Sequence, residues 1–286
     1  MYTHSITRAH RTAFALVIDG SGSMAEQIRY RGQLTTKAEA VAAITNDLLF
    51  ELIERARRSD GVRDYYDIAV MGYSGDDEVR SLLPFGQRFI PVTELAAQPM
   101  PMRTTLQEFR QPDGSVTQRE MPAPAWIEPC AAGQTPMCEA LRQVRDLLTV
   151  WTEKRANTDS FPPVVFNITD GEATDCDAEE LRTVSEQIRS LRTTDGNVLL
   201  INIHIAADET GRTVFFPTEE EAATCPNRYA ALLYDCSSRM PEVFEQAIRA
   251  AKGPGAMPPF RGMSFNASAA ELVAMLNIGS ISAKTE

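Results

Sequence analysis

Three places along the sequence carry oxygen-bearing side chains that could bind a cation. The first is Asp19-Gly20-Ser21-Gly22-Ser23, which directly follows the apolar run 13–18. The second is Asp170-Gly171, after the predicted strand 164–169, and the third is the hydroxyl of Thr135. Carboxylate and hydroxyl oxygens suit a hard cation such as Mg²⁺. The sequence therefore predicts one divalent-cation site made of Asp19, Ser21, Ser23, Thr135 and Asp170.

The elements that must position these residues are strands buried on both faces. An apolar run without polar alternation is typical of a strand in a parallel sheet that helices cover on both sides. In such sheets the carboxyl ends of the strands form one edge, where ligands bind. Two carboxylates and three hydroxyls at that edge make an incomplete octahedral set, which water and an outside acidic group would complete. The predicted site therefore favours an acidic partner.

Strands and amphipathic helices alternate along most of the chain, which predicts an α/β fold. The first helix is expected to begin at Thr35 or Thr36, because the stretch before it is polar and contains Gly32. Capping residues predict three further helix starts, at Thr135-Pro136, Asp177 and Ser268. Further strands are predicted over residues 68–73 and 198–206, edge strands over 79–83 and 262–265, and another helix over 241–251.

Residues 75–129 interrupt this alternation, because prolines recur throughout them and exclude a long helix. The turn signal Pro112-Asp113-Gly114 predicts a hairpin that joins residues 106–111 to 115–120. We interpret the whole stretch as an insertion without a core of its own. The chain is therefore predicted to be a single domain over residues 1–286.

Net charge, targeting signals and cysteine usage limit the classes of partner and predict the cellular compartment. A formal charge of −11 and a pI near 4.9 argue against nucleic acid and anionic membranes as partners. No secretory signal or membrane-spanning run is visible, so a cytoplasmic location is predicted. The cysteines form no C-x-x-C pair and are expected to be reduced thiols, with a Cys130–Cys138 loop as the alternative. They are Cys130, Cys138, Cys176, Cys225 and Cys236.

The cation motif also resembles a known family. D-x-S-x-S after the first strand, a threonine in a Gly-x-Thr loop, and Asp-Gly after a later strand are similar to the metal-ion-dependent adhesion site (MIDAS) of von Willebrand factor type A (VWA) domains. All five positions match. The resemblance runs from about Ala13 to Ile278, with the 75–129 insertion longer than expected. It implies a doubly wound, Rossmann-like sheet of about six strands in the order 3-2-1-4-5-6, parallel except for one edge strand.

The resemblance also implies a function. In such domains the two serines bind the metal directly, the aspartates often act through water, and a partner's Asp or Glu completes the shell. The expectation is a Mg²⁺-dependent protein-binding module, with Mn²⁺ or Ca²⁺ as other candidate ions, and not an enzyme. Stand-alone intracellular members occur in prokaryotes, in stress-response and chaperone-ATPase-linked systems such as tellurite resistance. The sequence does not identify the partner, and it leaves the oligomeric state open.

Two enzyme hypotheses compete with that of a protein-binding module. Gly20 and Gly22 after a buried strand, with Glu39 about twenty residues on, fit a dinucleotide fingerprint and predict a nucleotide (NAD)-binding Rossmann enzyme. Against it, Asp19 would face the pyrophosphate. A metal-assisted hydrolase would need a base, for which only Glu172 and Asp175 stand nearby. His204 lies inside an apolar strand and is interpreted as a hydrogen-bonded buried histidine.

Overall fold

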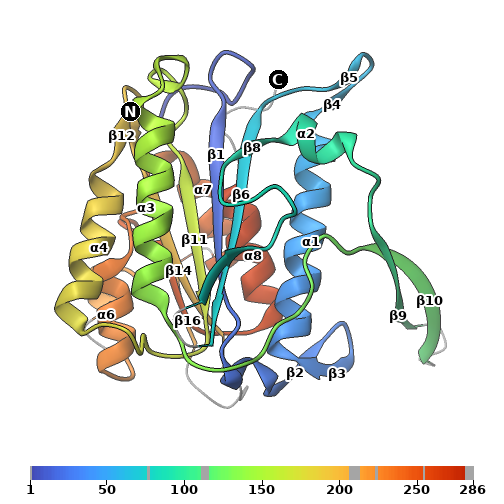
Figure 1. Cartoon of the computed structure of the whole chain (residues 1–286). Helices are drawn as coiled ribbons and strands as arrows, with labels where there is room; N and C mark the ends of the chain where they lie inside the picture. Colours follow the sequence, from blue (N-terminus) through green and yellow to red (C-terminus); the bar gives the residue numbers. More distant parts are fainter. Residues whose placement is uncertain are drawn as a thin grey trace.

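The computed structural model describes residues 2–75, 78–110, 116–205, 213–222, 225–253 and 255–280. Its centre is a twisted sheet of eight strands with helices on both faces (Figure 1). These strands are β1 (Thr12–Asp19), β6 (Tyr66–Ser74), β7 (Glu78–Ser81), β8 (Ile90–Pro91), β11 (Val164–Thr169), β14 (Leu199–Ile205), β15 (Val214–Phe215) and β16 (Met263–Ala267).

The strand order is β15-β16-β14-β11-β1-β6-β7, with β8 also paired to β6. Strands β6, β1, β11, β14 and β16 are parallel, and β7, β8 and β15 are antiparallel. The predicted order 3-2-1-4-5-6 is therefore present as β7-β6-β1-β11-β14-β16. Three predictions were wrong in detail: the sheet has eight strands instead of six, three strands instead of one are antiparallel, and residues 262–265 do not form an edge. The short strand β15 pairs outside β16, because Val214 and Phe215 find partners in Phe265 and Ser264.

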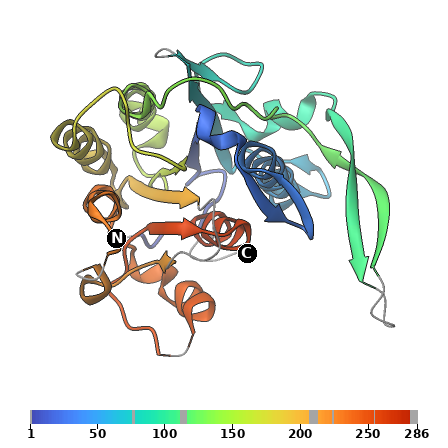
Figure 2. The same ribbon diagram turned by 90° about the horizontal axis from the view of Figure 1, so that it is seen from below.

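The helices form two layers. On one face α1 (Lys37–Ala56), α7 (Glu245–Lys252) and α8 (Ala269–Gly279) pack on the sheet, and on the other lie α3 (Met137–Glu153), α4 (Ala178–Ser190) and α6 (Arg228–Cys236) (Figures 1 and 2). Along β1, Phe14, Leu16 and Ile18 face the first layer, and Ala15 and Val17 face the second. Both faces of β1 are buried, which explains why its sequence lacks polar alternation.

Three of the four predicted helix starts are confirmed. Thr36, Asp177 and Ser268 each accept a hydrogen bond from a backbone N–H of the first turn, and each belongs to a complete capping box. The prediction that Thr135 caps its helix was wrong. Helix α3 begins at Met137, and its free N–H groups are satisfied by Asp175 from a distant loop: Oδ1 accepts from Cys138 (3.1 Å) and Oδ2 from Glu139 (2.8 Å).

The 75–129 insertion contributes β7 and β8 to the sheet edge and then leaves the body of the domain. Strands β9 (Met102–Arg110) and β10 (Val116–Pro124) form an antiparallel hairpin that projects from the domain in both ribbon views (Figures 1 and 2). The predicted hairpin is thus confirmed, although its Pro112–Gly114 turn lies outside the described residues. Buried Asn46 of α1 anchors the returning chain, because its side chain exchanges two hydrogen bonds with the backbone of Ile127 (2.8 and 3.0 Å).

Small elements complete the described chain. A hairpin of β2 (Gln27–Tyr30) and β3 (Gln33–Thr36) fills the polar stretch before α1. The others are β4 (Arg57–Arg58), β5 (Gly61–Val62), β12 (Arg192–Thr193), β13 (Gly196–Asn197), α2 (Val92–Ala97), α5 (Glu219–Ala222), and the 3₁₀ turns η1 (Gly22–Ala25), η2 (Arg155–Asn157) and η3 (Glu242–Phe244). Over the described ranges, every helix is too short or too polar to cross a membrane.

The cysteine prediction was wrong for two residues. Cys138, in the first turn of α3, is joined by a disulfide to Cys176, in the loop after β11. The alternative Cys130–Cys138 pairing is therefore also wrong, and Cys130 and Cys236 remain thiols. The bonded pair is 38 residues apart in sequence, and the two cysteines meet because α3 runs away from this edge of the sheet and β11 returns the chain to it. Cysteine spacing alone could not show this.

Candidate metal site at the carboxyl edge of the sheet

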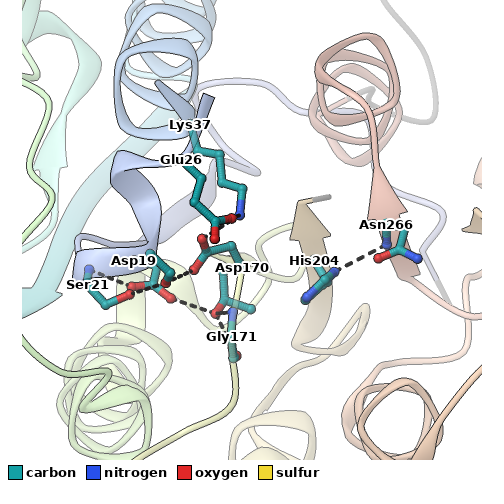
Figure 3. A network of polar contacts seen from close by, with 10 residues as sticks. Asp19, Ser21, Glu26, Lys37, Asp170, Gly171, His204 and Asn266 are labelled. Atoms are coloured by element: carbon teal, nitrogen blue, oxygen red, sulfur yellow. Dashed lines mark hydrogen bonds and ion pairs between the residues drawn. The ribbon is translucent and has the colours of Figure 1, made fainter. Parts of the chain in front are cut away.

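Four of the five predicted residues form one connected cluster at the carboxyl ends of β1 and β11 (Figure 3). Asp19 ends β1, Ser21 and Ser23 lie in the turn that follows, and Asp170 is the first residue after β11. The strands pair in parallel, with Ile18 opposite Ile168, so both turns begin at the same level. The structure therefore brings four of the five predicted residues together at one edge of the sheet.

The oxygens of this cluster are spaced like neighbouring ligands of a small cation. The hydroxyls of Ser21 and Ser23 are hydrogen-bonded to each other at 3.1 Å, and the Ser23 hydroxyl donates to Oδ1 of Asp170 at 2.6 Å. Adjacent ligands in an octahedron with Mg–O bonds of 2.0–2.1 Å are about 2.9 Å apart. Two hydroxyls and one carboxylate oxygen therefore form a row that fits the donor chemistry and the spacing of such an ion.

Asp19 supports this row from behind. Its Oδ1 accepts from the backbone N–H of Ser21 (2.8 Å), and its Oδ2 accepts from the hydroxyl of Thr169 (2.7 Å). Burial raises the pKa of Asp19 above the usual aspartate range, the bonds from Ser21 and Thr169 oppose this, and the nearby charge of Asp170 adds to the rise. A buried carboxylate beside a second one is an environment that favours a bound cation.

Thr135 stands next to this cluster but is joined to it through the backbone. Its loop meets the serine turn where the N–H of Gly22 donates to the carbonyl of Gly133 (3.0 Å). Thr135 is also clamped to Thr174, because its N–H donates to the Thr174 hydroxyl and its carbonyl accepts from the Thr174 N–H, both at 3.0 Å. In the described part of the chain, no hydrogen bond joins the Thr135 hydroxyl to the other four side chains.

Gly133 is required for this close approach. Its φ of +72° lies in the left-handed region, and a Cβ at this position would stand 2.2 Å from the Cα of Gly75. Gly75 and Gly133 form a parallel bridge, so the loop that carries Thr135 rests directly on the end of β6. Any larger side chain at Gly133 would push the threonine loop away from the serine turn.

Sequence reasoning missed two charged residues of the site, Lys37 and Glu26. The Lys37 ammonium lies 2.8 Å from Oδ2 of Asp170 and 2.6 Å from Oε2 of Glu26 (Figure 3). The side chains of Lys37 and Asp170 are 3% and 0% exposed, whereas that of Glu26 is 54% exposed. One oxygen of Asp170 thus faces the serines, and the other is paired with a buried cation of the protein itself.

A weak signal for Lys37 was present in the sequence. A lysine in the first turn of a helix faces the positive end of the helix dipole, which is unfavourable unless a carboxylate compensates for it. Lys37 is the first residue of α1, directly after its cap Thr36. The compensating carboxylate comes from Asp170, more than a hundred residues away, and no local pattern could identify it.

His204 lies in β14 near the site, and its geometry supports the interpretation of a hydrogen-bonded buried histidine. Its Nδ1 accepts from the backbone N–H of Asn266 at 3.3 Å (Figure 3). Its ring is stacked on Phe265, with the ring centroids 4.2 Å apart. Burial lowers the pKa of His204 from 6.5 to about 4, while the charge of Asp170 opposes the shift. The imidazole is therefore neutral in the folded protein at neutral pH.

This depressed pKa predicts a loss of stability in mild acid. The unfolded chain binds a proton at His204 below pH 6.5, whereas the folded protein resists protonation until about pH 4. Stability that is present above pH 6.5 is thus lost as the pH falls, by about 2 kcal/mol at pH 5. In His204→Phe, which keeps the stacking, urea unfolding should lose about 2 kcal/mol less than wild type between pH 7.5 and pH 5. Equal losses in both proteins would refute the assignment.

The dinucleotide reading conflicts with the local structure. A pyrophosphate loop must lead directly into a helix whose N-terminus binds the phosphates, but Gly22 leads into a 3₁₀ turn and the β2–β3 hairpin before α1 begins at Lys37. Glu39 is also committed elsewhere, since Oε2 accepts from the hydroxyl of Thr35 (2.6 Å) and the N–H of Thr36 (2.9 Å). Fluorescence titration with NADH is expected to show no binding. NADH affinity that persists after Mg²⁺ is removed would favour the enzyme.

Comparisons with known proteins bear on the fold alone. A scan against models of protein families finds no match, and a search of curated proteins finds none either. Among solved structures the chain is distantly similar to a von Willebrand factor type A protein from Catenulispora acidiphila, with 15% identity over 69% of this chain and 34% of that one, and a TM-score of 0.41. The vWF domain of the type V pili tip protein Mfa5 from Porphyromonas gingivalis shows 14% identity over 58% of this chain and 39% of that one, with a TM-score of 0.30. An uncharacterized membrane spanning protein from Vibrio fischeri shows 13% identity over 72% and 74%, with a TM-score of 0.26.

Proposed function

We propose that the chain is a protein-binding module that holds one divalent cation, Mg²⁺ or Mn²⁺, at the carboxyl edge of its sheet. The observation that carries the proposal is the row of oxygens from Ser21, Ser23 and Asp170, spaced at 3.1 and 2.6 Å. Asp19 would act as a hydrogen-bonded support, and Thr135 would complete the ligand set from the neighbouring loop. The bound ion would supply an open coordination position for an outside carboxylate.

The charges around the row would be balanced by a divalent ion. Asp19, Asp170 and Glu26 carry three negative charges, and Lys37 offsets one of them, at 2.8 Å from Asp170 and 2.6 Å from Glu26. A divalent ion would bring the net charge of these groups to zero, so a carboxylate of the partner would be held by the open coordination position of the ion.

Calorimetric titration of the metal-free protein with Mg²⁺ tests the ion site. Ser23→Ala and Asp19→Asn are expected to bind Mg²⁺ at least tenfold more weakly than wild type, since each loses a ligand or its support. Glu172→Gln is the matched control, because Glu172 is an exposed acid two residues after Asp170. Its affinity should be unchanged. Equal Mg²⁺ heats in wild type, Ser23→Ala and Asp19→Asn would rule out the site.

Recovery of partners tests the second half of the proposal. Proteins retained by the immobilised chain in Mg²⁺ should be released by a chelator, and Ser23→Ala should not retain them. Replacing the partner's contacting Asp or Glu by Asn or Gln should abolish capture, because neutral amides are poor substitutes for a carboxylate at a hard cation. Capture that survives the chelator would place the binding surface elsewhere on the domain.

The biological setting that the resemblance implies is part of the proposal. It comprises a cytoplasmic role in a prokaryotic stress-response or chaperone-ATPase-linked system such as tellurite resistance. The proposed role is binding without catalysis. Of the candidate bases, Asp175 is occupied in capping α3, His204 accepts a backbone hydrogen bond, and Glu172 is an exposed loop acid. Identification of the captured partner would decide the setting.

A further inference from the structure

Two of the three histidines of the chain meet at the end of the sheet opposite the oxygen row. The rings of His4 and His10 lie 4.2 Å apart, and Nδ1 of each approaches the carboxylate of Asp159, at 3.9 Å for His4 and 3.6 Å for His10. One ligand atom from each of the three residues lies within 4.8 Å of the other two. Figure 1 shows this end of the chain beside β12, away from β2 and β3.

The segment that carries His4 is held firmly against the domain. The N–H of Tyr2 donates to the carbonyl of Asp195 (2.6 Å), and the buried carboxylate of the same residue accepts from the N–H groups of Thr3 (2.8 Å) and His4 (3.2 Å). The Tyr2 hydroxyl donates to the carbonyl of Asn197 (2.9 Å). The imidazole of His4 therefore projects from a fixed backbone.

The other two residues are also oriented by neighbours. Oδ1 of Asp159 accepts from the hydroxyl of Thr194 (2.7 Å), and the Asp159 carbonyl lies 2.5 Å from Nδ1 of His10. If the Nδ1–H of His10 donates to this carbonyl, Nε2 is the ring nitrogen of His10 that is left to bind a metal, and the 3.6 Å approach of Nδ1 to the carboxylate only orients the ring. Oriented imidazoles and hydrogen-bonded carboxylates are the arrangement that surrounds metal ligands in proteins.

An unpartnered nitrogen of His4 is a second observation, separate from the clustering of the three residues, that points to a ligand. The Nδ1 atom of His4 is inaccessible to solvent and has no hydrogen-bond partner among the described residues, although a carboxylate oxygen lies 3.9 Å away. That gap is too long for a hydrogen bond. Nitrogen and oxygen ligands of a tetrahedral zinc ion are about 3.3 Å apart, given bonds of 2.0–2.2 Å, so a small contraction around an ion would satisfy the nitrogen.

We propose that His4, His10 and Asp159 bind one transition-metal ion, with Zn²⁺ as the occupant and a water at the fourth position. Imidazole nitrogen favours such an ion over Mg²⁺, so this site and the oxygen row differ in metal preference as well as in place. The alternative is a plain ion pair of Asp159 with one protonated ring, which would leave Nδ1 of His4 without a hydrogen-bond partner among the described residues. The ion would fasten residues 2–11 to the loop that leads into β11.

Titration with Zn²⁺ in excess Mg²⁺ tests the proposal on the full chain. Wild type should bind one Zn²⁺, and His4→Ala, His10→Ala and Asp159→Asn should each bind at least tenfold more weakly. Ser23→Ala and His204→Phe are the controls and should retain wild-type Zn²⁺ affinity. The weaker loss expected for Thr194→Val, which removes only the bond that orients Asp159, reports on the site even if a histidine variant unfolds.

A Co²⁺ absorption spectrum and thermal unfolding show which residues hold the metal ion. Co²⁺ at the proposed site should give visible absorption bands and no thiolate charge-transfer band. The spectrum of Ser23→Ala should be the same as that of wild type. Zn²⁺ should raise the unfolding temperature of wild type but not of His4→Ala. The proposal is overturned if wild type binds no Zn²⁺, if His4→Ala and His10→Ala bind it as tightly as wild type, or if a thiolate band shows that cysteines hold the metal. Loss of Zn²⁺ in Ser23→Ala alone would place the ion at the oxygen row and also overturn it.

Discussion

Replacing Lys37 by Met is expected to lower the free energy of unfolding by about 3 kcal/mol in the absence of divalent ions, because it leaves the Asp170 carboxylate buried without its cation. The ammonium lies 2.8 Å from an aspartate side chain that is 0% exposed. Methionine retains most of the apolar stem that packs at the start of α1, so the loss reports on the charge. Urea unfolding in the presence of a chelator measures it.

The control for this variant is the other partner of Lys37. Glu26 lies closer to the ammonium, at 2.6 Å, but its side chain is 54% exposed. Solvent screening makes an exposed pair worth at most about 1 kcal/mol, so Glu26→Gln should cost much less than Lys37→Met. In the double variant Lys37→Met/Asp170→Asn most of the lost stability should return, since no uncompensated buried charge remains. Equal costs for Lys37→Met and Glu26→Gln would contradict the assignment.

Metal binding adds a second test of Lys37. The ammonium and a divalent ion would both be attracted to Asp170 and would repel each other across a short distance. Lys37→Met should therefore bind Mg²⁺ more tightly than wild type, and saturating Mg²⁺ should recover part of the stability that the variant loses. If the variant bound Mg²⁺ more weakly, Lys37 would be a residue that positions Asp170 for the ion and not a competitor of it.

Short sequence patterns predicted the elements that depend on interactions between residues close in sequence, namely helix caps and buried strands. Thr36, Asp177 and Ser268 cap their helices because the matching glutamate lies three residues further on, and a sequence displays that spacing directly. The buried strands β1 and β11 were predicted because short, largely apolar runs that end at an Asp-Gly turn are typical of strands buried on both faces. The turns after them placed four of the five candidate ligands in one cluster.

What could not be predicted depends on contacts between distant segments. In the sequence, Asp175 cannot be distinguished from other acidic loop residues. Its role as the cap of α3, which was predicted for Thr135, depends on the tertiary contact between its loop and α3. The pairing of Lys37 with Asp170 joins the first residue of α1 to the loop after β11, 133 residues away in sequence. Strand β15 is two residues long and carries no pattern of its own, so its place outside β16 follows from the sheet and not from its sequence.

The second large effect concerns the Cys138–Cys176 disulfide, which joins the two loops that carry Thr135 and Asp170. The bond closes a loop of 38 residues, and the chain-entropy model assigns about 4 kcal/mol to such a closure at 25 °C. The variant Cys138→Ala/Cys176→Ala is expected to lose up to this amount in urea unfolding. Wild type in reductant should show the same loss, whereas the double variant should not respond to reductant.

The reduced protein should nevertheless stay folded, because hydrogen bonds already hold the same two loops together. Asp175 caps α3 at 2.8 and 3.1 Å, and Thr174 is bonded twice to Thr135 at 3.0 Å. The loss should therefore appear in the unfolding midpoint and in weaker Mg²⁺ binding, without a change in circular dichroism. Disulfides are rare in a reducing cytosol, so a thiol count on protein taken from cells tests the pairing against the cytoplasmic location predicted from sequence. Identical midpoints for wild type and the double variant, both in oxidising buffer, would show that the bond contributes nothing to the stability of this edge.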